Sequence, residues 1–70
     1  VEYTVQALEN LEKTDQIILT LYYKEELAVK DIDDVVGLSV ANIKVRLFRG
    51  RKRLMQELKK IFKNEMADLL

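Results

Sequence analysis

Apolar residues recur along the whole chain with the three-to-four-residue spacing of amphipathic helices, and no segment alternates as a β-strand does. The first two apolar stripes predict two helices, capped by Thr4 and by Thr14, because a threonine hydroxyl accepts a hydrogen bond from a free helix N–H group. The stripes consist of Val5, Leu8 and Leu11, and of Ile17, Ile18, Leu21 and Tyr22. Since proline is absent, the pattern predicts an all-α protein.

A helix-turn-helix is predicted at about residues 29–54. The apolar stripe of its first helix comprises Val29, Ile32, Val35 and Val36. Gly37 follows, where a helix often ends in a left-handed residue, and Ser39 supplies an N-cap oxygen for the next helix. A helix, three turn residues and a second helix match the spacing of the motif. We therefore expect a four-helix, winged-less helix-turn-helix domain, a bundle of three to four helices with a long recognition helix.

The recognition helix has one apolar side. At about 100° per residue, a narrow sector that we expect to be buried contains Ile43, Leu47, Gly50 and Leu54. Gly50 disfavours a helix, so it indicates either a close approach of another helix or a local bend. Phe48 lies about 140° from this sector. We expect Phe48 to pack on the first or second helix, with contact to a protein partner as the alternative.

The apolar period continues beyond Leu54 into an amphipathic extension, residues 55–70. Its apolar positions are Leu58, Ile61, Phe62, Met66 and Leu69. We expect this side to fold back on the first two helices, because so short a chain is poor in core. The alternative is a partner-binding or dimer-forming surface, edged by Lys59, Lys60 and Lys63.

The charges are sorted along the chain, although the net charge is zero. Residues 1–39 carry three lysines and nine acidic residues, a net charge of −6, whereas residues 40–63 carry nine basic residues and Glu57 alone, a net charge of +8. Such a domain can present a basic face to a polyanion and an acidic half to a different partner. The alternative is that both halves are ordinary solvated surface.

The exposed side of the recognition helix is predicted to bind DNA in the major groove. The small side chain of Ala41 lets the start of the helix approach the groove floor, and the amide of Asn42 matches an adenine edge, although Asn42 could also be an ordinary surface residue. Lys44, Arg46 and Arg49 can reach guanine acceptors or phosphates. The predicted DNA-binding residues are Ser39, Ala41, Asn42, Lys44, Val45, Arg46, Arg49, Arg51, Lys52 and Arg53.

Composition favours a binding module over an enzyme. The 70 residues include neither cysteine nor histidine, which excludes a thiol redox site, a cysteine- or histidine-ligated zinc site and histidine-based catalysis. We expect one domain, residues 1–70, with no cofactor, no metal and no small-molecule substrate. The sequence contains no signal peptide and no apolar run long enough for a membrane span, so a cytoplasmic location without membrane contact is expected. The chain begins at Val1 rather than at methionine, which suggests a piece of a longer protein.

Nearly the whole chain resembles region 4 of an RNA polymerase sigma factor, in the extracytoplasmic-function group of the sigma-70 family. That family's pattern has an Ala-Leu-x-x-Leu opening, a Leu-x-Tyr helix, a Leu-Ser-x-x-Glu-Ile-Ala-x-x-Leu-Gly-Ile-Ser helix and turn, and a Val-Lys-x-Arg-Leu-x-Arg-Ala-Arg-x-x-Leu helix. The last segment is the most specific of the four. The corresponding segments here are Ala7-Leu8-Glu9-Asn10-Leu11, Leu21-Tyr22-Tyr23, residues 27–39, and Ile43-Lys44-Val45-Arg46-Leu47-Phe48-Arg49-Gly50-Arg51-Lys52-Arg53-Leu54.

The resemblance implies recognition of the minus-35 element of double-stranded promoter DNA, with the domain docked on the beta-subunit flap of core RNA polymerase. It also implies a possible anti-sigma partner and, in the full-length protein, an N-terminal domain that reads the downstream promoter element. In this alignment the DNA-facing positions are Asn42, Lys44, Val45, Arg46 and Arg49, and the positions facing the DNA backbone are Arg51, Lys52 and Arg53.

The chain departs from the family pattern at several positions, four of which bear on capping or on the crossing of two helices. Glu12 replaces a proline after the opening leucine, and Glu26 and Ala28 replace the usual glycine and N-cap serine before the helix-turn-helix. Asp33 stands where the family prefers a small alanine at the crossing of two helices. Because a buried, unpaired carboxylate costs several kcal/mol, we expect Asp33 to point outward or to find a donor.

Two other function classes fit the same pattern. A helix-turn-helix of the response-regulator or repressor type also binds DNA, usually as a dimer on paired half-sites. A helical adaptor would bind a protein through Phe48 and the extension, with no steep dependence on salt.

Overall fold

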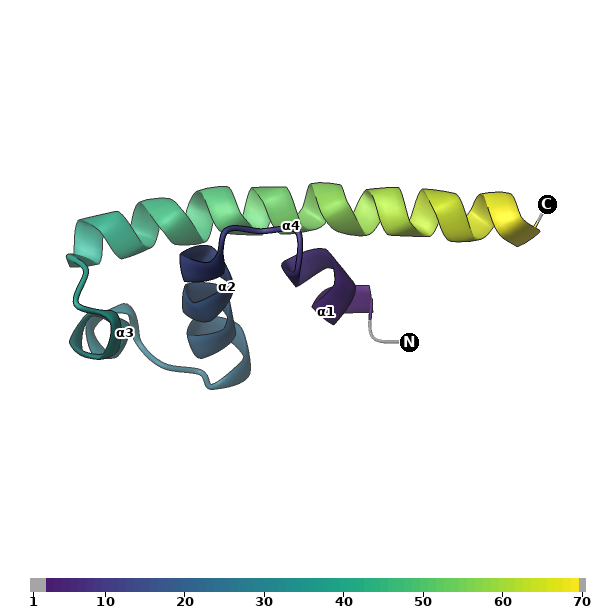
Figure 1. Cartoon of the computed structure of the whole chain (residues 1–70). Helices are drawn as coiled ribbons and strands as arrows, with labels where there is room; N and C mark the ends of the chain where they lie inside the picture. Colours follow the sequence, from purple (N-terminus) through teal and green to yellow (C-terminus); the bar gives the residue numbers. More distant parts are fainter. Residues whose placement is uncertain (1–2, 70) are drawn as a thin grey trace.

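The computed structural model describes residues 3–69, and the side chains of residues 3–67. Every regular element in this range is a helix, as the sequence predicts. The longest helix, α4, runs the length of a molecule that measures 47 × 19 × 16 Å, and α1, α2 and α3 lie along one side of it (Figure 1). The elements are α1 (Tyr3–Leu8), α2 (Lys13–Leu19), the π-helical turn η1 (Thr20–Lys24), α3 (Val29–Val36) and α4 (Val40–Leu69).

The core joins α2, α3 and α4 through one isoleucine from each helix. Ile18, Ile32 and Ile43 are fully buried and contact one another. Burial of each such side chain contributes about 1.5–3 kcal/mol of transfer free energy. The partly buried residues packed around this cluster are Leu21, Leu27, Val29, Val36, Leu38 and Leu47.

The turn between α3 and α4 has the conformation that the sequence predicts. Gly37 ends α3 in the left-handed region, at φ 72° and ψ 24°, and its N–H group donates to the carbonyl oxygen of Asp33 at 2.8 Å. The hydroxyl of Ser39 accepts a hydrogen bond of 3.2 Å from the N–H group of Asn42, in the first turn of α4. The predicted boundaries of α3, the three-residue turn and the Ser39 cap are confirmed.

Gly50 marks a close approach of two helices, one of the two alternatives that the sequence left open. The glycine is buried, and a Cβ atom built on it would lie 3.2 Å from Cδ1 of Leu19. A side chain at position 50 would therefore require the Leu19 side chain to shift by a few tenths of an ångström.

Both predicted threonine caps are wrong. Thr4 lies inside α1, which includes Tyr3, and Thr14 lies inside α2, whose N-cap is Glu12. The first turn of α2 begins earlier than predicted because the Gln16 N–H group donates to the Glu12 carbonyl at 3.0 Å. The Gln16 side chain also donates to the Leu11 carbonyl at 2.8 Å, which holds the chain at the entry to α2.

Several apolar residues that were expected to be buried are exposed. Each of α1, α2 and α3 is short and contacts the core along one edge only, so part of its apolar stripe remains in solvent. Phe48 does not close a core with the first or second helix as expected, because it projects from a side of α4 that those helices do not cover. The exposed fractions are 49% for Val5, 46% for Ile17, 63% for Val35 and 63% for Phe48.

Part of the apolar side of the C-terminal extension packs on the first helix, as expected, but the chain does not reverse to bring it onto the second. Helix α4 continues without a break for 30 residues, a length of about 45 Å at the usual rise per residue. Instead α1 packs beside it, with the rings of Tyr3 and Phe62 in an edge-to-face contact at a centroid separation of 5.3 Å. Packing a short first helix against α4 preserves the backbone hydrogen bonds that a reversal of the chain would break.

The departures at Glu26 and Ala28 have visible structural consequences. Glu26 is left-handed, at φ 57°, a conformation that costs a residue with a side chain about 1–2 kcal/mol. Hydrogen bonds of the Glu25 N–H group to the Thr20 carbonyl and of the Leu27 N–H group to the Leu21 carbonyl hold this turn, at 3.1 and 3.0 Å. Ala28 has the extended N-cap geometry, φ −67° and ψ 154°, but provides no side-chain hydrogen bond to α3.

As expected, Asp33 is not a buried carboxylate without a hydrogen-bond partner. Its side chain is half-buried. Among the residues that the structure describes, no buried side-chain oxygen or nitrogen lacks a hydrogen-bond partner.

A polar cluster around Glu57, which the sequence pattern did not reveal, joins α4 to the turn after α1. Glu57 is only 5% exposed. Its carboxylate accepts hydrogen bonds from Asn10 Nδ2 at 3.2 Å, Arg53 Nε at 2.9 Å and Lys60 Nζ at 3.5 Å. Burial alone would raise the pKa of Glu57, but the hydrogen bond from Arg53 and the positive charges of Lys60 and Arg53 together lower it. The cluster therefore favours the ionised carboxylate.

Replacing Ala28 with serine should stabilise the domain. The backbone at this position already has the geometry in which a serine hydroxyl caps a helix, so we expect the free energy of unfolding to rise by about 1 kcal/mol in urea titrations. Ala67→Ser, an exposed substitution within α4, is the matched control and should give no gain, because serine is a poorer helix former than alanine. An unchanged or lower stability of Ala28→Ser would contradict the capping analysis.

Glu57→Gln should lower stability at neutral pH and weaken its dependence on acid. Because folding lowers the pKa of Glu57, its contribution is present above the ordinary glutamate pKa and is lost as the pH falls through the folded-state pKa. The melting temperatures of the wild type and the variant should therefore differ from neutral pH down to the ordinary glutamate pKa and converge only below it. Glu65→Gln, at an exposed position of the same helix, should not show this convergence.

Candidate nucleic-acid interface

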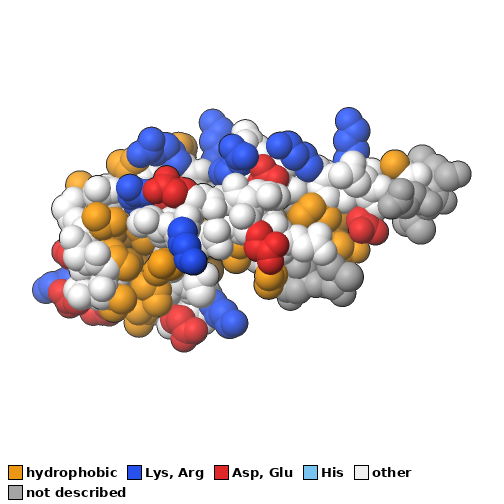
Figure 2. Space-filling view, in the orientation of Figure 1, with side chains coloured by type: hydrophobic (Ala, Val, Ile, Leu, Met, Phe, Trp, Pro, Cys, Tyr) orange, Lys and Arg blue, Asp and Glu red, His pale blue; other side chains and the backbone are white. Residues whose placement is uncertain are grey.

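The basic residues of α4 form a surface on the side facing away from the other helices. Lys and Arg side chains follow the edge of α4 that is remote from α1, α2 and α3 (Figure 2). Ile43 is fully buried on the opposite side, so the helical period turns the residues between the core positions outward. The exposed members of the predicted site in this region are Ser39, Ala41, Asn42, Lys44, Val45, Arg49, Arg51, Lys52 and Arg53.

Lys44, Arg49 and Lys52 on this surface form neither an ion pair nor a side-chain hydrogen bond with another described residue. Among the described residues, no carboxylate lies within ion-pair distance of Lys44, Arg49 or Lys52. A cation that has no partner in the protein gives up no internal contact when it approaches a phosphate or a base edge, and its counterions are released.

Arg46 differs from these cations because it faces α2. Its Nη1 atom lies 3.0 Å from Oδ1 of Asp15 and 3.5 Å from Oε1 of Glu12, and its side chain is 26% exposed. The hydrogen bond to Asp15 outweighs the effect of desolvation and, with the charges of Asp15 and Glu12, raises the pKa of Arg46 above its ordinary value. Arg46 therefore ties the start of α4 to α2, through two acidic partners that the sequence pattern did not single out.

The same guanidinium orients Asn42. Nε of Arg46 donates to Oδ1 of Asn42 at 3.0 Å, while the N–H group of Asn42 is capped by Ser39. Arg46 thus holds the oxygen side of the Asn42 carboxamide, and the Nδ2 atom lies on the opposite side of the group. A chain of contacts leads from Asp15 through Arg46 to an exposed amide at the start of α4.

The two remaining predicted arginines are anchored at the flanks of the surface. Nη1 of Arg51 donates to the hydroxyl of Tyr23 at 3.1 Å, and Nε of Arg53 donates to Glu57 at 2.9 Å. Both side chains remain exposed. Each guanidinium has further N–H groups with which it can contact a phosphate.

Exposed apolar side chains interrupt the cationic surface. Phe48 lies one helical turn from both Lys44 and Lys52, and 63% of it is exposed. Val45, 48% exposed, lies on the same side one turn earlier. Phe48 also lines two shallow surface depressions, one beside Tyr22 and Tyr23 and one beside Met55 and Lys59.

An apolar groove of about 490 Å³ opens between α1, the end of α2 and α4. This groove is separate from the predicted DNA-facing residues, none of which lines it. Its walls carry partly buried and exposed apolar side chains, so a helical segment of another protein could bury them. The lining residues are Thr4, Val5, Leu8, Leu19, Thr20, Tyr23, Lys24 and Leu54.

Within residues 3–69, no helix combines the length and apolarity that crossing a membrane requires. Over that range, no three residues of the types His, Cys, Asp and Glu are grouped so that they could hold a metal ion.

Comparison with known proteins identifies the family. The model of the family described as Sigma-70, region 4, matches residues 2–54. The chain belongs to this family. Region 4 is a DNA-binding domain of sigma factors and not an enzyme, and the helix-turn-helix and the cationic face of α4 both lie within the matched residues.

Curated relatives of this region 4 domain are themselves sigma factors. The RNA polymerase sigma factor FliA of Salmonella typhimurium is 35% identical over 57 residues, which cover 81% of this chain and 24% of the relative. FliA of Escherichia coli K12 is 33% identical over the same length and coverage. The chain thus spans about a quarter of the length of the curated relatives that it matches. No solved structure matches it.

Proposed function

We propose that this region 4 domain recognises the minus-35 element of promoter DNA through the start of α4 and docks on core RNA polymerase to direct transcription initiation in the cytoplasm. The observation that carries the proposal is the outward face of α4, where free cations surround small and polar side chains at the start of a helix anchored by a buried core. That combination suits entry into a major groove.

Within this face, Ala41, Asn42, Lys44, Val45 and Arg49 are the proposed base-facing residues. Arg49 and Lys44 match guanine acceptors, and the Asn42 amide matches an adenine edge. The half-exposed side chain of Val45 suits the methyl group of thymine, which offers an apolar contact on the groove floor.

Phe48 extends the apolar part of the proposed reading surface. Its exposure between two lysines is costly in water, but an aromatic ring can cover a thymine methyl while the neighbouring cations contact phosphates. Ser39, Arg51, Lys52 and Arg53 lie at the start and flanks of the helix, and we assign them to the DNA backbone.

For Arg46 the contacts support a positioning role. Its guanidinium bonds to Asp15, Glu12 and Asn42, so it fixes the rotation of α4 against α2 and orients the Asn42 amide. Through that amide Arg46 would influence base recognition without inserting its own side chain into the groove.

The apolar groove between α1, α2 and α4 is the proposed docking site for the beta-subunit flap of RNA polymerase. Its apolar walls include Val5, which is 49% exposed, and they lie away from the cationic face, so DNA and polymerase can bind together. An anti-sigma protein that covered this groove would compete with the polymerase. Assignment to the extracytoplasmic-function group remains a prediction from the sequence.

Substitutions on α4 should separate base reading from backbone contact. With a duplex selected by the wild type from a random library, Arg49→Ala should weaken binding by about 1–3 kcal/mol and relax sequence preference, whereas Lys52→Ala should weaken selected and random duplexes almost equally. Lys24→Ala removes the same charge from η1 and should have little effect.

Binding should also depend steeply on salt. In fluorescence anisotropy, the logarithm of the DNA affinity should fall against the logarithm of the salt concentration with a slope of about −3.6 for four neutralised phosphates. A flat salt response, or no change with Arg49→Ala, would contradict the proposal.

Docking should be separable from DNA binding. Val5→Glu places a carboxylate in the apolar groove and should weaken binding to an isolated beta-subunit flap at least about tenfold, because a charge would be desolvated in the complex. The matched control is Val35→Glu, the same change at an exposed position of α3 outside the groove. Both variants should bind DNA as the wild type does. Equal loss of flap binding in both variants would argue against the groove, as measured by isothermal titration calorimetry.

A further inference from the structure

About the last four turns of α4 carry an exposed apolar stripe that the proposed function does not use. It consists of Met55, Phe62 and Met66, which are 51%, 51% and 59% exposed. We call these three residues the C-terminal stripe. Their spacing of seven and then four residues places them on one face of the helix. All three lie beyond residue 54, where the match to the region 4 family ends.

The C-terminal stripe is not covered by the rest of the domain. Helix α1 packs against another side of α4, where Leu58 and Ile61 are half-buried. The Tyr3 ring contacts Phe62 edge to face at 5.3 Å but leaves about half of it in solvent. Three large apolar side chains in a row, each about half exposed, are typical of a surface that a partner covers.

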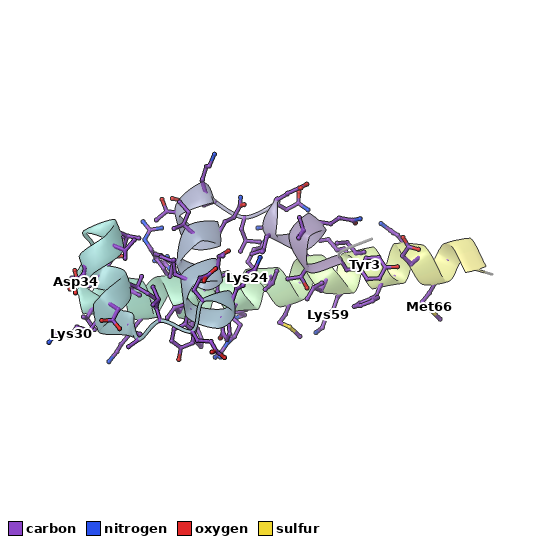
Figure 3. All side chains as sticks on the ribbon, turned by 90° about the horizontal axis from the view of Figure 1, so that it is seen from below. Tyr3, Lys24, Lys30, Asp34, Lys59 and Met66 are labelled. Carbon is purple, nitrogen blue, oxygen red and sulfur yellow. The ribbon has the colours of Figure 1, made fainter. Side chains whose placement is uncertain are left out.

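On one side of the stripe the described charged residues are all positive, whereas Glu65, which is exposed next to Met66, lies on the other side. Lys52, Lys59 and Lys63 are exposed and lie within one turn of the stripe residues, and no described carboxylate forms an ion pair with them. Lys59 and Met66 project from the same edge of α4, away from α1 (Figure 3). Lys60, by contrast, is turned toward Glu57. An occupant of the stripe therefore approaches a rim of three free lysines.

We propose that the C-terminal stripe is the docking surface for an amphipathic helix of another protein, with apolar residues on its contact side and acidic residues at its flanks. Acidic flanks complement the lysine rim and set the orientation of the partner. From Met55 to Met66 the stripe is about 16 Å long, which matches two to three turns of a partner helix with anchors at positions i, i+3 or i+4, and i+7. The two methionines adapt their shape to such anchors.

A second copy of this chain is a poorer occupant of the same surface. In an antiparallel pair formed through the stripe, the lysine rims would face each other, and like charges at those positions oppose pairing. A lipid surface is also a poorer fit, because membrane affinity scales with buried apolar area and only three residues are offered here.

The stripe is independent of the proposed promoter contact. Phe62 lies about 25 Å along the helix axis from Val45, so a helix bound at the stripe leaves the start of α4 open. Binding of a helix at the stripe does not depend on whether the domain recognises a minus-35 element.

The test uses two designed helical peptides of three heptads, with leucine at the contact positions and either glutamate or lysine at the flanking positions. The complete chain should bind the glutamate peptide at least about tenfold more tightly than the lysine peptide in fluorescence anisotropy. The double variant Lys59→Glu/Lys63→Glu should reverse that preference. The matched double variant Lys13→Glu/Lys24→Glu changes the net charge equally but should keep the wild-type preference.

Removal of the apolar anchors should weaken the same complex. Met55→Ser and Met66→Ser should each reduce affinity for the glutamate peptide about tenfold, with thermal melts showing that α4 remains folded. The proposal is overturned if neither peptide binds, if both bind equally, or if Lys59→Glu/Lys63→Glu leaves the preference unchanged. It is also overturned if sedimentation shows a dimer that Met66→Ser disrupts, or if phosphatidylserine vesicles, but not the peptides, bind through the stripe.

Discussion

One helix forms the wall of the core and presents the proposed recognition surface, and the rest of the structure depends on how that helix is packed. Ile43 buries one side of α4 against Ile18 and Ile32, and Gly50 allows Leu19 to approach within van der Waals contact. Because the helical period links inward and outward positions, burying Ile43 determines which residues face solvent. The cationic face is a geometric consequence of the apolar contacts behind it.

Polar contacts define the orientation of α4 more closely than apolar packing alone does. Isoleucine side chains resist separation of the helices but tolerate small rotations, because the hydrophobic effect has no direction. The contacts of Arg46 with Asp15 and of Glu57 with Asn10 join α4 to segments early in the chain, at 3.0 and 3.2 Å. One acts near the start of α4 and the other in its second half. Together they restrict the small rotations of the helix about its own axis that apolar burial still allows.

Local sequence signals suffice to predict the helix-turn-helix, but they do not predict the tertiary contacts and the exposure of the residues around it. Gly37 and Ser39 act through their own backbone and side chain, so the turn and the start of α4 are readable from sequence. Asp15 and Asn10, the partners of Arg46 and Glu57 outside α4, are 31 and 47 residues away, and helix spacing predicts contacts only three or four residues apart. The aromatic character of Phe48 predicts burial, but its exposure depends on where α1 and α2 end, which is a tertiary property. The DNA-facing roles remain predictions.

The unbroken course of α4 couples the proposed DNA-reading face to the C-terminal stripe, which lies beyond the residues that the family model matches. The match to region 4 ends at residue 54, yet the same helix continues to Leu69, so the rotation set by the core at Ile43 is carried into the C-terminal stripe. Seven-residue steps drift by only about 20° on a straight helix, which leaves Phe48, Met55 and Phe62 on nearly the same side. A partner held at the stripe would therefore keep a fixed orientation relative to the proposed DNA-reading face. A flexible linker at residue 55 would remove that coupling, whereas a continuous helix transmits it.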